Sequence, residues 1–335
     1  MRIKDAFQVA NHLLDVNIPV MLWGSPGIGK SDVARQLAVH RNMKIEDVRL
    51  SQMDPVDMRG VPFVETWRDG KVTKWAIADF FTRLHMEPTI LFFDEINSAA
   101  QATQAAAYQI ILDRMLGDFR LPEHTRLLAA GNNIGDGAIV NQMSTALRNR
   151  FAHIDVEEHL DDWCKWAAEI GKVPSEIIGC LRFRTSLLNE GSKKEARNNK
   201  VFATPRGWER VGKLMGRNLP ESTEFYAYSA IVGEGAAIEF RGYLKYHRDI
   251  PDMEKLLKDP KGYKLPDEPA MQYALSAKLA EYATVKNFDK VVQVAARLPA
   301  EFQVIMMIDA VRRTQTLTGT PQFTAWVAQN SEVVF

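Results

Sequence analysis

The sequence predicts an α/β protein in which a parallel sheet, sandwiched by helices, is followed by an all-helical part. Three observations support this prediction. A buried strand runs through a glycine-rich loop into a helix between residues 20 and 40. A continuous apolar run at residues 89–93 is typical of a strand covered on both faces, as in a parallel sheet. Strand patterns stop after Val156, and helical patterns replace them.

The bulk composition is that of a globular protein with more than one folding unit. At 335 residues and 37.9 kDa, the chain is long for one hydrophobic core, so we expect two or three units. Hydrophobic residues make up 46% and charged residues 25%, which are ordinary proportions. The 42 basic and 42 acidic residues give a formal net charge of zero. This balance disfavours a general binder of nucleic acids or membrane surfaces, although a local basic patch is compatible with it.

Cysteine usage and the absence of long apolar runs favour a cytoplasmic protein. Cys164 and Cys180 lie far apart without CxxC spacing, so each is expected to be a buried thiol rather than part of a disulfide or metal site. No apolar run approaches the roughly 20 residues of a membrane span. The start, Met1 to Asp5, lacks the apolar core of a signal peptide.

The first element is an expected amphipathic helix. Apolar residues recur at helical spacing at Ile3, Phe7, Ala10 and Leu14, which predicts a helix that covers the sheet. Pro19 then begins the first strand at its edge, where a missing N–H is least harmful.

The glycine-rich loop that follows has the spacing of a P-loop: a glycine, four residues, and then Gly29-Lys30-Ser31. Backbone N–H groups of such a loop surround a phosphate at the positive end of the next helix, and glycine permits the close approach. Lys30 would contact the β- and γ-phosphates of ATP, and the Ser31 hydroxyl would bind Mg²⁺. The predicted nucleotide-binding residues of the loop are Gly24, Ser25, Pro26, Gly27, Ile28, Gly29, Lys30 and Ser31.

A short strand at residues 47–50 and a turn-rich joint at 54–60 precede a predicted hairpin. Its strands are Val61–Trp67 and 72–75, and the Asp-Gly pair between them is the strongest short-range hairpin signal. One interpretation makes the hairpin an element that touches the substrate; the other makes it an edge hairpin with solvated charges and packed tryptophans. The aromatic and basic residues concerned are Trp67, Arg68, Lys71, Lys74 and Trp75.

Two acids end the apolar run of residues 89–93. Asp94 and Glu95 would lie at the carboxyl end of a parallel strand, where ligands bind in such sheets. Asp94 could hold Mg²⁺ through water, and Glu95 could orient and activate the attacking water. The alternative is a capping pair for the helix expected at 99–112. With a P-loop upstream, the catalytic interpretation is favoured.

Polar residues also follow the next strand pattern, and basic residues precede the last. The strand pattern at 126–133 ends in polar amides, of which Asn132 could position a water against the γ-phosphate; alone, the Asn-Asn-Ile-Gly context would indicate a turn. Arg148 and Arg150 lie between a helix end and a last strand at 153–156. Without a resemblance to a known family, the better interpretation is that an arginine at this place is a solvent-exposed surface residue.

The rest of the chain is expected to be helical. Asp161 could cap a helix whose Trp163 and Trp166 are core residues rather than a cofactor site. Thr204 as N-cap, followed by Pro205, would place Arg206 in the opening turn of a helix. Further elements are a polar loop at 189–200, a joint at 263–269 and helices at 271–282 and 301–314.

Five motifs together resemble an AAA+ ATPase of the MoxR group, in the helix-2-insert clade. Their order and type match the Walker A, Walker B, sensor 1, arginine-finger and sensor 2 motifs of that family. The motifs are GSPGIGKS at 24–31, ILFFDEINSA at 90–99, LLAAGNN at 127–133, ALRNRF at 146–151 and ATPRGWERV at 203–211. The resemblance covers about the first two thirds of the chain.

The resemblance implies a role for each matching residue. Lys30 and Ser31 would bind phosphate and Mg²⁺, Asp94 would hold Mg²⁺, Glu95 would be the catalytic base, and Asn132 would be sensor 1. Many relatives have Gln-Asn-Pro where this chain has Gly131-Asn132-Asn133, so the sensor could shift to Asn133.

The resemblance also implies two arginine roles. Arg150 would be a finger donated to the γ-phosphate of the neighbouring subunit, and Arg148, two residues earlier, could share or take over that role. Arg206, in a helical lid, would touch the phosphates bound by its own subunit.

The implied domains are an AAA+ core at 1–156 with a hairpin insert at 61–75 and a helical lid at 157–240. The helical extension expected at 241–335 has no match to the family's motifs. The implied function is Mg²⁺-dependent ATP hydrolysis by a ring, most often a hexamer, coupled to chaperone-like remodelling. Relatives usually act with a partner that carries a von Willebrand factor A domain. The alternatives are a nucleic-acid motor or restriction-type subunit, with the hairpin on DNA, and a nucleotide-gated scaffold that hydrolyses little, which the Asp94-Glu95 pair disfavours.

Overall fold

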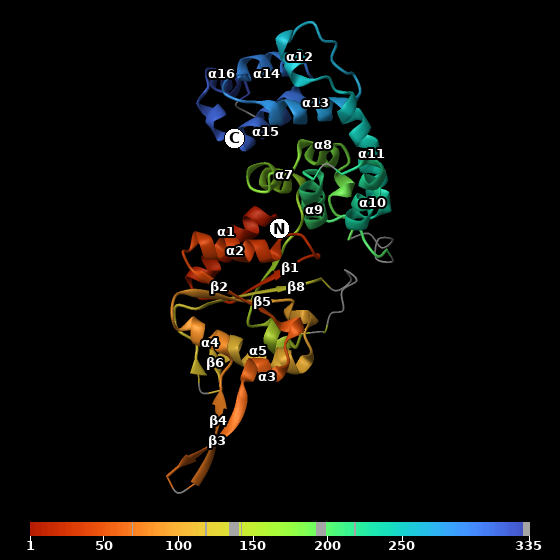
Figure 1. Ribbon diagram of the computed structural model, residues 1–335. Helices are drawn as coiled ribbons and strands as arrows, with labels where there is room; N and C mark the ends of the chain where they lie inside the picture. Colours follow the sequence, from red (N-terminus) through yellow and green to blue (C-terminus); the bar gives the residue numbers. More distant parts are fainter. Residues whose placement is uncertain are drawn as a thin grey trace. The chain divides into compact units, whose positions relative to one another are not determined.

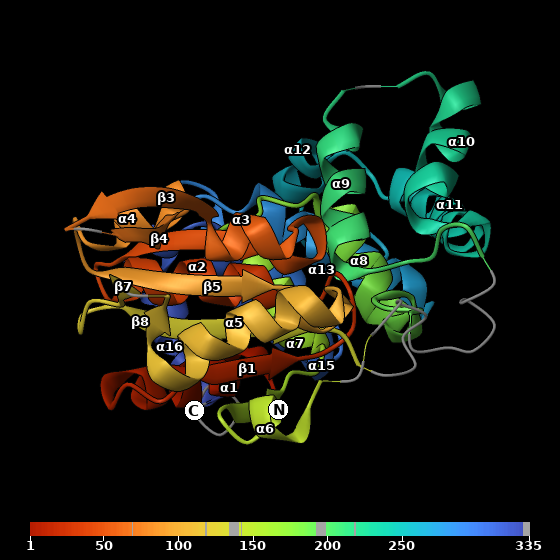
Figure 2. The same ribbon diagram turned by 90° about the horizontal axis from the view of Figure 1, so that it is seen from below.

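The computed structural model divides into two compact units, Met1–Glu158 and His159–Phe335 (Figures 1 and 2). Within the described part of the chain, all β-strands lie in the first unit. The boundary therefore falls close to Val156, where strand patterns end in the sequence. The structure describes residues 1–68, 70–117, 119–133, 141, 143–191, 199–217 and 219–330.

The first unit is built on a five-stranded parallel sheet with the spatial order β2-β5-β8-β1-β9. The predicted α/β fold with a parallel sheet is confirmed. Its strands are β1 (Val20–Trp23), β2 (Lys44–Arg49), β5 (Thr89–Asp94), β8 (Arg126–Gly131) and β9 (Ala152–Asp155).

Alternate side chains along each strand enter two separate hydrophobic clusters, because successive strand residues point to opposite faces of a sheet. Leu22 and Phe92 pack with α1 and α2, whereas Met21 and Phe93 pack with helices on the other face. Figure 1 shows these two helical layers on either side of the sheet. They are α1 (Ile3–Asp15) and α2 (Lys30–His40) on one face, and α3 (Pro55–Arg59), α4 (Asp79–Leu84) and α5 (Gln101–Asp113) on the other.

The predicted hairpin is present as a separate antiparallel sheet of β3 (Val61–Trp67) and β4 (Gly70–Ala76). Val61 pairs with Ala76 at its base, and Trp67 pairs with Gly70 at its tip. Most of its side chains are exposed, and Figure 1 shows it projecting away from the main sheet of the same unit. Asp69 of the turn lies outside the described residues.

Two short helices and two short strands of the first unit were not predicted. They are α3, which lies in the segment expected to be a turn-rich joint, α4, and the two-residue strands β6 (Met115–Leu116) and β7 (Phe119–Arg120). Elements of two to six residues carry too little periodicity to be read from sequence. The helix expected from residue 99 begins at Gln101, after a 3-10 turn at Ile96–Ser98.

The second unit is all-helical in its described residues, as the sequence predicts. Helices before and after residue 240 share one buried cluster, which includes Trp163, Trp208, Phe240 and Phe302. A division into a lid at 157–240 and an extension at 241–335 stays a prediction. The helices are α7 (Leu160–Glu169), α8 (Ser175–Phe183), α9 (Pro205–Met215), α10 (Glu221–Val232), α11 (Glu234–Asp249), α12 (Met253–Lys258), α13 (Pro269–Tyr282), α14 (Phe288–Ala295), α15 (Ala300–Arg313) and α16 (Pro321–Gln329).

Local predictions in this unit have different outcomes. The prediction that Asp161 caps a helix is wrong: His159 is the N-cap of α7, and Asp161 lies in the first turn, where its charge still suits the helix dipole. Trp163 is buried in the core, as predicted. Of the predicted loop at 189–200, residues 192–198 lie outside the described part.

Both cysteines are buried and free, as predicted. Burial raises the pKa of the Cys164 thiol to about 12 and that of Cys180 further, so both are held as neutral thiols at physiological pH. No helix within the described ranges has the length and apolarity that crossing a bilayer requires.

His247 on α11 makes the stability of the helical unit depend on pH. Burial lowers the pKa of its imidazole from 6.5 to about 4; Lys278 adds to this shift, and Glu281 opposes it. Its Nδ1 lies 3.8 Å from an oxygen of Glu176. Below pH 6.5 the unfolded chain binds a proton that the folded chain does not, so the unfolding free energy falls as the pH falls toward 4.

Because of His247, we expect the unfolding free energy to be about 2 kcal/mol lower at pH 5 than at neutral pH. His247→Gln should remove this part of the pH dependence, because glutamine does not titrate. Urea unfolding of both proteins at pH 7.5 and pH 5 measures it, with pH 7.5 as the baseline at which the histidine is neutral in both states. An equally steep decline in the variant would contradict the assignment.

Candidate functional site

The strand order brings three predicted site segments to one edge of the sheet. In the order β5-β8-β1, the end of β8 lies between the ends of β1 and β5. Because the strands are parallel, their carboxyl ends meet at the same edge. The loop that starts at Gly24, the pair Asp94-Glu95, and Asn132 are therefore neighbours.

The glycines of the loop are required by its backbone. Gly24 has φ 157°, and a Cβ there would lie 2.3 Å from Cδ1 of Ile28 and 2.7 Å from the carbonyl oxygen of Val156. Gly29 has φ 107° and caps the start of α2. The amides of Gly27 and Gly29 donate no hydrogen bond to another described group. The loop thus presents backbone donors at a helix N-terminus, which is a cradle for an anion.

Lys30 connects this cradle to the end of β8. Its ammonium group is buried and donates to the carbonyl oxygens of Gly24 (2.5 Å) and Ser25 (3.0 Å). It also donates to Oδ1 of Asn132 at 3.0 Å. These three oxygens hold the ammonium group at the loop.

Ser31 and Asp94 form an oxygen-rich pair next to Lys30. The Ser31 hydroxyl donates to Oδ2 of Asp94 at 2.9 Å, and Oδ1 of Asp94 accepts from the amide of Glu95 at 3.0 Å. Hydroxyl and carboxylate oxygens are the ligands that Mg²⁺ prefers, so these residues fit a magnesium ion. Burial raises the pKa of Asp47 on β2, and the negative charge of Asp94 raises it further.

Glu95 has an unusual backbone and a partner that the sequence did not reveal. Its φ of 54° and ψ of 36° lie in the left-handed region, which is uncommon for a residue other than glycine. The Ser51 hydroxyl donates to Oε2 of Glu95 at 2.6 Å. Ser51 lies in the 3-10 turn that follows β2, and β2 pairs with β5. Only the pairing of these strands brings the two residues together.

We expect Ser51→Ala to lower ATP turnover about three- to tenfold. This factor corresponds to the loss of one hydrogen bond, the bond that fixes the Glu95 carboxylate. ATP affinity should change less than twofold, because Ser51 does not contact the loop residues. Ser51→Thr keeps the hydroxyl and is the matched control. Unchanged turnover in the alanine variant would show that this bond does not position Glu95.

Asn97 is a second residue that sequence reasoning missed. Its Nδ2 donates to the carbonyl oxygen of Asn132 at 2.7 Å, and its Oδ1 accepts from the Asn132 amide at 3.1 Å. The side chain of Asn97 is buried, so both bonds are shielded from water. This reciprocal pair fixes the backbone from which the Asn132 side chain reaches Lys30.

Arg148 and Arg150 lie at the opposite edge of the sheet. Arg148 ends α6 (Thr145–Arg148), and Arg150 comes two residues before β9. Ala152, the first residue of β9, pairs with Val20 at the start of β1, whereas the P-loop follows the end of β1. Both arginine side chains are exposed and make no hydrogen bond or ion pair with another described residue.

Arg206 occupies the predicted position in the second unit. It is an exposed residue in the first turn of α9, with Pro205 before it. The Thr204 hydroxyl caps the helix by accepting from the amide of Gly207 at 3.0 Å.

The hairpin exposes aromatic, aliphatic and basic groups together. Trp67 is 54% exposed and Val64 is 66% exposed. The Arg68 guanidinium lies 4.3 Å from the centroid of the Trp67 ring, and Lys74 pairs with Glu65 at 2.5 Å. Its tryptophans are thus not buried in a core, against one of the two interpretations of the sequence.

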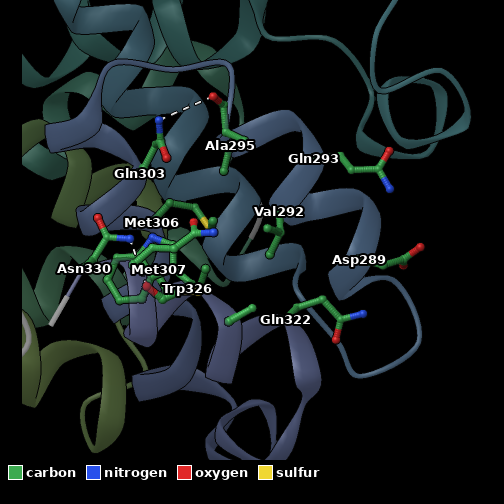
Figure 3. A pocket seen from close by; sticks show the side chains of 13 residues that line it. Asp289, Val292, Gln293, Ala295, Gln303, Met306, Met307, Gln322, Trp326 and Asn330 are labelled. Carbon is green, nitrogen blue, oxygen red and sulfur yellow. Dashed lines mark hydrogen bonds between the residues drawn. The ribbon is translucent and has the colours of Figure 1, made fainter.

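A pocket of about 410 Å³ lies elsewhere, among α14, α15 and α16 of the helical unit (Figure 3). It is lined by apolar side chains such as Met306, Met307 and Trp326 and by amides such as Gln322. None of the site residues that the sequence predicts lines it.

Comparison with known proteins finds a family model that matches most of the first unit. Residues 19–151 match the family model for the AAA domain of the dynein-related subfamily. The Thermotoga maritima RuvB Holliday junction branch migration motor is 18% identical, over 76% of this chain and 74% of that chain, with a TM-score of 0.41. NtrX from Brucella abortus in complex with ADP is 13% identical, over 98% and 68%, also with a TM-score of 0.41. At this similarity, neither structure indicates what this chain acts on.

Proposed function

Because residues 19–151 match the family model for the AAA domain of the dynein-related subfamily, we propose that this chain hydrolyses ATP within a ring and uses the energy to remodel a protein target. One observation carries the hydrolytic part of the proposal. The P-loop, the two acids of β5 and the amide of Asn132 converge on one edge of the sheet, where Lys30 bonds Asn132 at 3.0 Å and Ser31 bonds Asp94 at 2.9 Å.

Each residue of this cluster has a proposed task. Lys30 exchanges its loop carbonyl partners for the β- and γ-phosphates of ATP. Glu95 orients a water for in-line attack and accepts its proton. Asn132, which already bonds Lys30, positions that water, and this contact supports Asn132 over Asn133 as the sensor. Ser31 and Asp94 would hold Mg²⁺, which supplies positive charge to the phosphate oxygens when bound.

The ring is proposed from the position of Arg150. Arg150 comes before the start of β9, which lies beside the start of β1, whereas the P-loop of the same subunit follows the end of β1. The four residues of β1, at about 3.3 Å each, therefore separate the two positions by about 13 Å. We propose that Arg150 acts on the γ-phosphate bound by a neighbouring subunit. A hexamer is the expected assembly, and Arg206 is proposed to contact phosphates from the helical lid.

The exposed hairpin supports a polypeptide as the target. Its exposed large side chains are mainly apolar, including Phe63, Val64 and Trp67. The basic side chains are partly engaged within the hairpin, Lys74 with Glu65 and Arg68 with Trp67. Apolar groups suit the exposed hydrophobic segments of a protein better than they suit phosphates. A partner with a von Willebrand factor A domain and membership of the MoxR group belong to the same proposal.

The test is ATPase stimulation by two kinds of target. We expect an unfolded protein such as reduced, carboxymethylated lactalbumin to stimulate hydrolysis several-fold, and Trp67→Ser to remove that stimulation. Lys71→Ser, on the same strand pair, is the matched control for a basic residue. Stimulation by single-stranded DNA that falls steeply with added salt, and is lost in Lys71→Ser, would favour a nucleic-acid motor instead.

A further inference from the structure

The turn that carries Arg148 and Arg150 is tied to the P-loop strand through one histidine. Nε1 of Trp23 donates to Nδ1 of His153 at 2.7 Å, and the two ring planes are inclined by only 13°, with centroids 5.9 Å apart. On its other side, Nε2 of His153 lies 2.8 Å from the carbonyl oxygen of Arg148. The imidazole thus bridges β1 and the end of α6.

These two bonds require one form of the imidazole. A carbonyl oxygen only accepts, so Nε2 of His153 must carry a hydrogen and donate to Arg148. The indole N–H of Trp23 only donates, so Nδ1 must accept. The neutral Nε2–H tautomer satisfies both bonds at once.

Both ends of this bridge are next to functional segments. Trp23 ends β1 directly before Gly24, whose carbonyl oxygen accepts from Lys30. The Arg148 carbonyl also accepts from the amide of Phe151 at 3.1 Å, which closes the turn that contains Arg150. Phe151 is buried, and its ring meets that of His153 edge-on.

We propose that His153 is a positioning residue for the arginine that each subunit presents to its neighbour. It would act by holding the Arg148–Phe151 turn against Trp23, and it would link the nucleotide loop of one subunit to catalysis in the next. The inference rests on the proposed function, because it requires a ring with an arginine acting in trans.

The test compares uniform and mixed rings. His153→Ala in a uniform ring should lower turnover about 10- to 100-fold, since a displacement of about 1 Å in a catalytic group has an effect of that order. The Kd for a non-hydrolysable ATP analogue should stay within twofold, because the mutated subunit keeps its own P-loop. His153→Gln, which retains one acceptor and one donor, should recover part of the turnover.

Mixing variant subunits then distinguishes two causes of lower turnover: loss of the arginine that a subunit supplies to its neighbour, and damage to the subunit's own nucleotide site. With excess Glu95→Gln subunits, each His153→Ala subunit is flanked by an intact arginine turn. Its activity should rise to that of wild-type subunits diluted with the same excess. If His153→Ala is not restored while Arg150→Ala is, the positioning role is wrong and the ring proposal stands. If Arg150→Ala is not restored either, the trans arginine itself is wrong.

Trp23→Phe provides a second, milder variant. It keeps an aromatic side chain beside His153 but removes the indole N–H donor together with one of the two fused rings. Lower turnover that mixing restores would support the inference even if His153→Ala did not assemble, whereas unchanged turnover in Trp23→Phe would overturn it.

Discussion

Changing Arg150 to alanine is expected to lower ATP turnover by about 10³- to 10⁵-fold, the range found for arginines that neutralise transition-state charge in P-loop enzymes. Arg150 is exposed and lies before β9, at the sheet edge opposite the P-loop of its own subunit. ATP binding should persist, because the loop and its lysine are intact. Steady-state hydrolysis and nucleotide titration of the same preparation measure both quantities.

Two controls make the Arg150 result specific. Arg148→Ala removes the other exposed arginine of the turn, and the variant with the larger loss identifies the finger. Mixing Arg150→Ala with Glu95→Gln subunits should restore activity, because each inactive subunit supplies what the other lacks. Absence of any recovery at all mixing ratios would argue against action in trans.

Glu95→Gln is expected to stop turnover while ATP stays bound. Glutamine has nearly the shape of glutamate and can still accept the hydrogen bond from Ser51, but it cannot take a proton from water. General-base contributions of about 10²- to 10⁴-fold set the expected loss. Quenched reactions that separate bound ATP from ADP measure it directly.

Lys30→Ala is the contrasting variant for Glu95→Gln. The buried ammonium group that bonds the loop carbonyls and Asn132 is lost, so we expect nucleotide binding to disappear along with turnover. If the Gln variant of Glu95 turned over ATP at the wild-type rate, another group would have to be the base.

Much of the candidate site could be predicted because its signals are local. The glycines of the P-loop, the acids after an apolar run and the Asp-Gly turn act within a few residues of the chain, and each forms the same local structure in most contexts. Thr204 and Pro205 likewise begin α9 as expected. Asp161 shows the limit of such signals, since a residue two positions earlier became the helix cap.

The sequence by itself determined which residues have the chemistry: Lys30, Ser31, Asp94, Glu95 and Asn132 are recognisable from residue type and spacing. Only the tertiary structure decided which of them meet. The position of β8 between β1 and β5 brings Asn132 to Lys30, and the pairing of β2 with β5 brings Ser51 to Glu95. The contacts of Asn97 with Asn132 and of His153 with Trp23 have the same origin. These hydrogen bonds join residues 35 to 130 positions apart, and strand order, which no local pattern encodes, sets them.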